Sequence, residues 1–327
     1  MTKDPNVVQG FKGFTIAMVQ VGSITADKQS NLEHTAEKIR EAAKGSLAYP
    51  KIDIIMLPEI FNSPMSCSAH RANAEVVPEI PQGSTISPKE LPSIKHSPTL
   101  HMLSGAAIET GCWIIGGSIP ECAEGQNEDD ERTWNCLTAW NSEGHLVAKY
   151  RKIHMYDVDI PGGITVKESS TITPGRDPLI LKTPFGTIGL AICYDIRFPS
   201  LLAAMIEKDK DICAYLLPSA FNCVTGPFAW EVLQKVRAID NQIFVGMCSP
   251  ARNDDNEYVS YGHSLVCAPN GTIISTPTPE DESECIVFAR LEPESMRTCR
   301  RWLPVWQSQR NDVYTTPSLL AQHNKAL

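Results

Sequence analysis

Apolar residues recur along the chain with two different periods. The segment FTIAMVQV, residues 14–21, is a continuous apolar run of the length of a buried strand. Residues 26–46 instead place Leu32, Ala36 and Ile39 at helical spacing between charged residues, which predicts an amphipathic helix. The chain therefore begins with a strand followed by a helix.

Strands and helices continue to alternate toward the C-terminus. Strands are predicted at 52–60, at 112–121, on both sides of a turn at 142–144, and at 187–193, 212–218, 242–249, 262–268 and 285–290. Helices are predicted in three places: before Gly111, after Pro199 and at 227–240. Gly111 suits the C-terminal cap of the first of them. The Asn270-Gly271 pair is a strong signal for a hairpin turn.

Two stretches depart from this alternation. Residues 62–100 are rich in Pro and Ser and predict a long loop, in which 70–81 is a candidate lid. Residues 122–133 are acidic and predict a solvated hairpin tip. Because βα units and hairpins are mixed, and no repeat or change in composition divides the chain, we expect one domain of sheets with helices outside.

Composition excludes several classes of protein. The chain of 327 residues has a formal net charge of −9 and no Lys/Arg-rich block, so no nucleic-acid partner is expected. No run approaches the roughly 20 apolar residues of a membrane span, so no membrane partner is expected either. The N-terminal segment MTKDPNVVQGFKG has neither the apolar region of a signal peptide nor an Arg-rich presequence.

The eleven cysteines point to a reducing compartment. They are scattered, with no Cys-x-x-Cys pair and no Cys/His cluster of zinc spacing. A chain of this length does not need disulfide bonds for stability, so free thiols are expected. We therefore predict a cytoplasmic protein and leave a mitochondrial location open.

One cysteine stands at a position suited to catalysis. In GLAICYDIRFP an apolar run ends at Cys193, and Asp195 and Arg197 precede a predicted helix. A corner between a strand and a helix presents a nucleophile to helical N–H groups that stabilise negative charge. The ordinary alternative is a small apolar residue at a strand end. Asp195 and Arg197 are expected to brace the turn.

A thiol with a pKa near 8.5 needs a base to react at neutral pH. Histidine is one option, but the chain lacks the Cys-Gly-Ser-Cys-Trp segment of papain-like enzymes. The other option is a carboxylate working with a fixed cation. Glu59 and Lys152 each follow an apolar strand, and Glu168 lies in a later loop. Each of the three also suits an ordinary exposed position.

Taken together, these segments resemble the nitrilase superfamily of carbon–nitrogen hydrolases. LPEIFNSP contains Glu59, YRKIHMYDVDIPGGITVKES contains Lys152 and Glu168, and GLAICYDIRFP contains Cys193, in the chain order of that family. The chain is most similar to the omega-amidase branch, through SAFNCVTGPFAWEVLQKVRAIDNQIFVGMCSPARNDDNEYVSYGHS and WQSQRNDVY. Relatives often have His where this chain has Ala229, a difference that concerns substrate preference.

The resemblance implies a fold and a domain plan. The fold would be a four-layer α-β-β-α sandwich of the nitrilase superfamily. A single carbon–nitrogen hydrolase domain would occupy residues 13–315, between an N-terminal tail at 1–12 and a C-terminal tail at 316–327. The resemblance also implies a homodimer, with the helical layers in contact and the C-terminal segment reaching across.

The resemblance implies hydrolysis of the side-chain amide of a small dicarboxylic acid monoamide, such as 2-oxoglutaramate, 2-oxosuccinamate or succinamate. Cys193 would attack the amide, Glu59 would move protons, Lys152 and the N–H of Tyr194 would hold the oxyanion, and Glu168 would position them. No metal or organic cofactor has a task in this scheme. Further candidate substrate contacts are Phe61, Tyr194, Arg197, Phe221, Asn222 and Thr225.

Three other functions remain open from the sequence. The segment AICYDIRFP also suits a deaminated glutathione amidase or another amidase of the superfamily. A non-catalytic binding protein of the same fold would be expected to lack one of the three central residues. A redox protein would be expected to contain paired thiols.

Overall fold

The computed structural model describes residues 6–81, 83–123, 132–161, 164–255 and 258–320. Two β-sheets carry most of the strands. The first has the order β14-β1-β2-β4-β5-β6, with β3 beside β4, and the second has the order β13-β12-β11-β10-β9. The first comprises β1 (Phe14–Gln20), β2 (Ile54–Met56), β3 (Glu75–Val76), β4 (Trp113–Cys122), β5 (Trp134–Trp140), β6 (Leu146–Arg151) and β14 (Cys285–Leu291). The second comprises β9 (Leu179–Thr183), β10 (Gly186–Leu190), β11 (Ile212–Pro218), β12 (Phe244–Cys248) and β13 (Leu265–Cys267).

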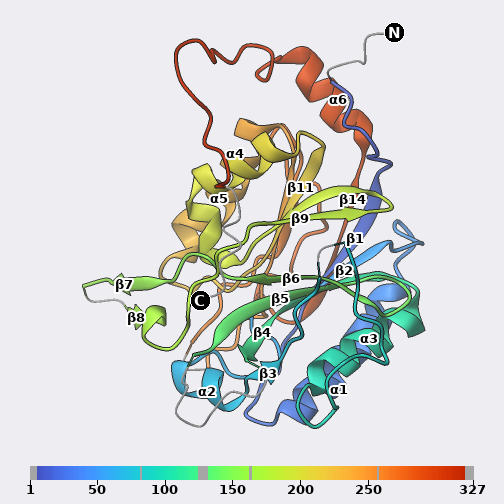
Figure 1. Cartoon of the computed structure of the whole chain (residues 1–327), viewed down its shortest axis with the longest axis vertical. Helices are drawn as coiled ribbons and strands as arrows, with labels where there is room; N and C mark the ends of the chain where they lie inside the picture. Colours follow the sequence, from blue (N-terminus) through green and yellow to red (C-terminus); the bar gives the residue numbers. More distant parts are fainter. Residues whose placement is uncertain (1–5, 82, 124–131, 162–163, 256–257, 321–327) are drawn as a thin grey trace.

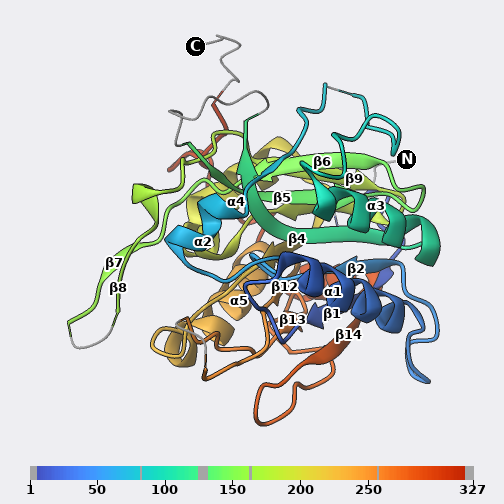
Figure 2. The same cartoon turned by 90° about the horizontal axis from the view of Figure 1, so that it is seen from below.

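Helices cover the outer faces of both sheets. Helices α1 (Lys28–Ala43) and α3 (Pro98–Thr110) pack together on the first sheet, and α4 (Pro199–Lys208) and α5 (Gly226–Asn241) lie beside the second. Figure 1 shows α1 and α3 on the opposite side of the strands from α4 and α5, and Figure 2 gives the view of the molecule from below. The predicted four-layer α-β-β-α sandwich is confirmed.

The side-chain pattern of β1 explains why the layers form. Ile16 and Met18 point into the core between the sheets, whereas Ala17 and Val19 point toward α1 and α3. Because successive side chains of a strand alternate between its faces, a run that is apolar throughout buries both faces. The same alternation directs the polar residues of strand ends either into the sandwich or away from it.

Two predicted chain turns are confirmed. Gly111 ends α3 with a φ of +65°, in the left-handed region that favours glycine. Asn270-Gly271 forms a tight turn, since Gly271 has a φ of +81° and the Ala268 N–H donates to the Thr272 carbonyl oxygen at 2.8 Å.

The prediction of a continuous loop at 62–100 was wrong. This segment contains α2 (Cys67–Ala72), and β3 joins the first sheet beside β4. The buried Glu75 carboxylate accepts hydrogen bonds from the Thr99 N–H at 3.0 Å and from Lys28 Nζ at 3.1 Å. Both elements are too short to show a hydrophobic period. The candidate lid at 70–81 is thus anchored to the sheet and to the start of α3.

Several further elements were not predicted. They are the hairpin of β7 (Asp157–Asp159) and β8 (Thr165–Lys167), strand β9, and helix α6 (Pro293–Trp302). Within the predicted N-terminal tail, Val8 and Phe11 pack in the core. The acidic stretch at 122–133 and the C-terminal tail lie largely outside the described residues. Among the helices of the described part, none is long and apolar enough to cross a membrane.

Candidate active site

Glu59, Lys152 and Cys193 come together beyond the ends of three strands. Glu59 follows β2 and Lys152 follows β6 in the first sheet, whereas Cys193 follows β10 in the second. Cys193 begins the 3₁₀ helix η2 (Cys193–Arg197) with a φ of +46°, an unusual backbone conformation for a residue other than glycine. The two sheets therefore contribute different parts of one cluster.

The polar groups of this cluster bond to one another. Lys152 Nζ lies 3.1 Å from Glu59 Oε1 and 2.8 Å from Glu168 Oε1. The Glu59 carboxylate, the Lys152 ammonium group and the backbone of Ala220 all lie close enough to the Cys193 thiol to affect its pKa. The exposed fractions of Glu59, Lys152 and Cys193 are only 3%, 2% and 7%. Ionisable groups buried this deeply require such partners.

Burial and the neighbouring charges shift the pKa of each group. Burial raises the pKa of Glu59 above 4.5, although Lys152 opposes the shift. Burial and Glu59 raise the pKa of the Cys193 thiol well above 9.0. Burial by itself would lower the pKa of Lys152, but Glu168, Glu59 and Cys193 outweigh it and hold that pKa well above 10.5. The resting cluster therefore pairs a protonated thiol and an ammonium group with a carboxylate that accepts a proton readily.

Glu168 is held in place by hydrogen bonds to both of its carboxylate oxygens. It begins the 3₁₀ helix η1 (Glu168–Ser170), and its Oε2 accepts a hydrogen bond from the Tyr156 N–H at 2.6 Å. Its Oε1 faces Lys152. Glu168 thus connects Lys152 to the chain that follows it.

Asp195 braces the turn, as expected from the sequence. Its side chain is completely buried and accepts four hydrogen bonds: from the Ile192 N–H at 3.0 Å, the Tyr150 hydroxyl at 2.6 Å, the His154 N–H at 3.0 Å and His154 Nδ1 at 2.7 Å. Tyr150 and His154 stand on either side of Lys152 in the chain. Asp195 therefore ties the segment of Cys193 to the segment of Lys152.

Arg197 was expected to brace the turn as well, but its contacts in the structure are different. Its guanidinium carbon lies 5.9 Å from the centroid of the Tyr194 ring and 5.1 Å from that of Phe221. Both distances are typical of cation–π contacts. A positive group is thus held against two aromatic rings close to the nucleophile.

The other candidate substrate contacts lie in different surroundings. Asn222 and Thr225 belong to one loop, where Asn222 Oδ1 accepts hydrogen bonds from the Thr225 N–H at 2.9 Å and the Val224 N–H at 3.0 Å. Phe61 has an exposed fraction of 0% and packs in the apolar cluster beneath α1 and α3. Its location is that of a core residue.

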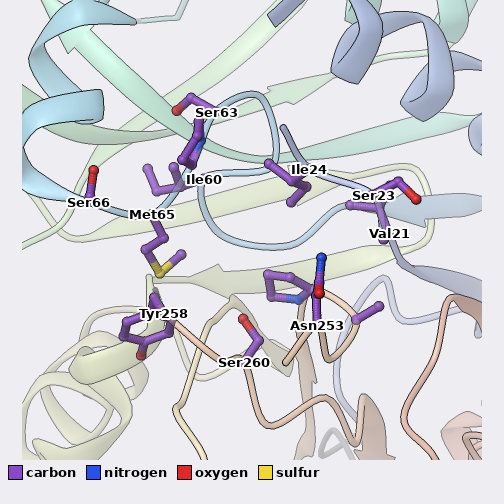
Figure 3. Close-up of a pocket in the computed structure, with 14 residues that line it drawn as sticks. Val21, Ser23, Ile24, Ile60, Ser63, Met65, Ser66, Asn253, Tyr258 and Ser260 are labelled. Atoms are coloured by element: carbon purple, nitrogen blue, oxygen red, sulfur yellow. The ribbon is translucent and has the colours of Figure 1, made fainter. Parts of the chain in front are cut away.

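Figure 3 shows a pocket that is lined in part by the chain following Glu59. Ile60, which follows Glu59 directly, and Tyr258 are part of its wall. The Tyr258 hydroxyl donates a hydrogen bond to the carbonyl oxygen of Ala220, a residue whose backbone also affects the pKa of the Cys193 thiol. Burial raises the pKa of Tyr258 well above 10, and so favours its neutral hydroxyl.

Sequence reasoning missed three residues close to the cluster. They are Tyr258, His70 and Asn135. The Nε2 atom of His70 lies 3.3 Å from the Trp134 carbonyl oxygen. Asn135 Nδ2 donates a hydrogen bond to Glu59 Oε1 at 2.8 Å. Burial lowers the pKa of His70 to about 4. A signal was available only for Asn135, as an amide within the apolar strand WNCLTAW.

All eleven cysteines are free. Within the described ranges, no three His, Cys, Asp or Glu side chains gather as a metal site.

Comparisons with known proteins find similar proteins along most of the chain. The family model described as carbon–nitrogen hydrolase matches residues 15–301. The chain is 39% identical to "Omega-amidase NIT3" of Saccharomyces cerevisiae, over 92% of this chain and 94% of that protein. It is 37% identical to "Omega-amidase NIT2" of Homo sapiens, over 92% and 96%. The crystal structure of Saccharomyces cerevisiae Nit3, titled a member of branch 10 of the nitrilase superfamily, matches with a TM-score of 0.75 at 35% identity, over 91% of this chain and 97% of that one.

Proposed function

The chain belongs to the carbon–nitrogen hydrolase family of the nitrilase superfamily, and we propose that it is an omega-amidase. It would hydrolyse the side-chain amide of 2-oxoglutaramate to 2-oxoglutarate and ammonia, and would also accept 2-oxosuccinamate and succinamate. The observation that carries this proposal is the buried contact of Lys152 with Glu59 beside the Cys193 thiol. The relatives named omega-amidase supply the substrate class.

The first half of the reaction transfers the acyl group to sulfur. Glu59 takes the thiol proton while Cys193 Sγ forms a bond to the amide carbon, and the carbonyl electrons move onto oxygen. The Lys152 ammonium and the Tyr194 N–H hold this oxyanion. Glu59 then passes its proton to the nitrogen, the carbon–nitrogen bond breaks, and ammonia leaves a thioester.

The second half restores the enzyme. Glu59 takes a proton from water, whose oxygen attacks the thioester carbon. When the new tetrahedral species collapses, the carbon–sulfur bond breaks, and the sulfur takes back a proton from Glu59. Glu168 holds the ammonium of Lys152 in place through both halves, in line with their distance of 2.8 Å.

The remote carboxylate of the substrate requires a positive partner. Arg197 is the candidate, because it lies next to the nucleophile and its described contacts are with aromatic rings. Tyr194 and Phe221 would line the site beside Arg197, and Asn222 and Thr225 would shape the loop that follows Phe221. The core position of Phe61 gives it no such part.

A substrate panel tests the proposal directly. Purified protein is assayed for ammonia release from 2-oxoglutaramate, succinamate and deaminated glutathione. We expect kcat/KM to be highest for a dicarboxylic acid monoamide. A clear preference for deaminated glutathione would instead assign the chain to that activity, and no turnover of any of the three would reject both.

We also propose a homodimer. Phe228, Val232, Val236 and Ile239 stand at helical spacing on α5 and are 38–64% exposed, which leaves an apolar stripe on an outer helix. The resemblance to the family suggests that a second copy covers this stripe. Sedimentation of the full chain should give the mass of a dimer, and Val232→Glu should shift it to a monomer. A monomeric parent protein at micromolar concentration would contradict the proposal.

The free cysteines support a reducing compartment, and we propose the cytoplasm, with the mitochondrion as the alternative.

A further inference from the structure

We propose that Asn135 is a positioning residue that holds the Glu59 carboxylate by one oxygen and leaves the other oxygen to the proton of Cys193. The inference rests on the proposed function for the role of Glu59, and goes beyond it by assigning a residue that the sequence did not point to. Asn135 acts through Glu59 and would make no bond to the substrate.

The pairing of β5 with β6 places Asn135 in the cluster. In this antiparallel pair Leu137 lies opposite Tyr150 and Cys136 lies opposite Arg151. The next pair is Asn135 and Lys152, and the Lys152 N–H donates to the Asn135 carbonyl oxygen at 2.9 Å. Residues directly opposite each other on one face of a sheet have side chains in contact range. Both side chains therefore point into the sandwich together.

The two side chains converge on a single atom. Asn135 Nδ2 donates to Glu59 Oε1 at 2.8 Å, and Lys152 Nζ lies 3.1 Å from the same oxygen. The donor end of Asn135 must face the carboxylate, because the other amide orientation would set two acceptor oxygens against each other. Rotation of the Glu59 carboxylate would break both bonds. The two bonds thus fix the orientation of the Glu59 carboxylate.

The rest of the Asn135 side chain argues against a purely structural role. The residue is 1% exposed, and its Oδ1 has no hydrogen-bond partner among the described residues. An unpaired buried carbonyl oxygen destabilises a fold, and an apolar side chain would avoid this cost. The bond to Glu59 is the observed use of the amide.

The test is the pH dependence of Cys193 alkylation in Asn135→Leu. Ionised Glu59 would lose one N–H donor, which makes it harder to ionise. We expect the acidic limb of the alkylation rate with iodoacetamide to move up by about one pH unit, which is roughly a tenfold slower reaction at a fixed pH on that limb. Mass spectrometry of the Cys193 peptide separates this thiol from the other ten. Amide turnover by the same variant should lose kcat, with little change in KM.

Two further variants make the outcome decisive. Asn135→Ala should move the limb in the same direction, and serves if the shape of leucine prevents folding. Thr138→Val is the matched control, because Thr138 is a buried polar residue of the same strand that bonds the Trp140 indole instead of the cluster. The free energy of unfolding of this variant should fall, whereas the acidic limb of its Cys193 alkylation rate should stay at the same pH.

An unmoved limb in the Asn135 variants would overturn the inference, and so would an equal movement in Thr138→Val. Alkylation needs no amide substrate, so this result can be read even if the proposed omega-amide substrates are wrong. Conversely, activity on those substrates with an unmoved limb would reject only the role of Asn135.

Discussion

The reaction centre and the loop that follows β11 differ in where their polar groups find partners. In the centre, Lys152 bonds to Glu59 and Glu168, which come from other parts of the chain. In the loop after β11, Asn222 Oδ1 instead accepts two hydrogen bonds from the backbone of its own loop, two and three residues away, and its Nδ2 makes one longer bond to the Tyr156 hydroxyl at 3.3 Å. Contacts between strand ends therefore set the chemistry, whereas local loop geometry shapes the space around it. Substitutions in the two regions should fail in different ways.

The largest effect should come from the nucleophile. Cys193→Ala removes one sulfur from a buried position, and we expect kcat for omega-amide hydrolysis to fall by at least about 10⁴-fold, as for other covalent catalysts. Circular dichroism should show an unchanged fold. Ammonia release at more than about a hundredth of the parent rate would mean that another group attacks the amide.

The next largest effect should come from the oxyanion partner. Lys152→Met keeps the length of the side chain and removes its charge, so kcat should fall by roughly 10²–10³-fold while KM changes little. Thermal unfolding is measured in parallel, because Glu59 and Glu168 lose their buried counter-charge. A rise in KM at constant kcat would instead place Lys152 in substrate binding.

The candidate partner of the substrate carboxylate should affect affinity more than rate. Arg197→Met removes the guanidinium beside Tyr194 and Phe221, and KM for 2-oxoglutaramate should rise by roughly 10–100-fold, as expected for a lost charge-assisted bond. The value of kcat should stay within a few-fold of the parent. A loss of kcat with unchanged KM would instead place Arg197 in the chemical step.

The pH dependence follows from the pKa of Glu59. Because burial raises this pKa above 4.5, the free base is lost as the pH falls through a value above that of an ordinary glutamate. On this limb kcat/KM should fall about tenfold per pH unit. The pKa values of Cys193 and Lys152 are raised well above 9.0 and 10.5, so the rate should stay level from neutrality to at least pH 9. A limb at or below 4.5 would contradict a buried base.

The smallest effect on activity should come from Phe61. Phe61→Leu leaves a gap in the cluster beneath α1 and α3, so the free energy of unfolding should fall by about 1 kcal/mol or more. The values of kcat and KM should stay within about twofold. A large change in KM at unchanged stability would restore Phe61 to the substrate pocket.

Local sequence patterns predicted most of the strands and helices, whereas the resemblance to the nitrilase superfamily pointed to the centre. Taken singly, Glu59 and Lys152 each also suited an ordinary exposed position after a strand. The role of Asn135 depends on the register of β5 against β6, which a single strand does not reveal. Helix α6 was missed because PESMRTCRRW is short and rich in charged residues, and its buried residues are only Met296 and Arg300. Contacts of Arg197 with two rings likewise exist only after folding.

The central claim is that Cys193 carries the acyl group during amide hydrolysis. The most direct test is to quench the enzyme with acid during turnover of succinamate and to analyse its peptides by mass spectrometry. The account predicts a succinyl thioester on the peptide that contains Cys193, and its absence in Cys193→Ala. Acylation at a different residue, or turnover with an unmodified Cys193 peptide under conditions that trap other thioesters, would contradict it.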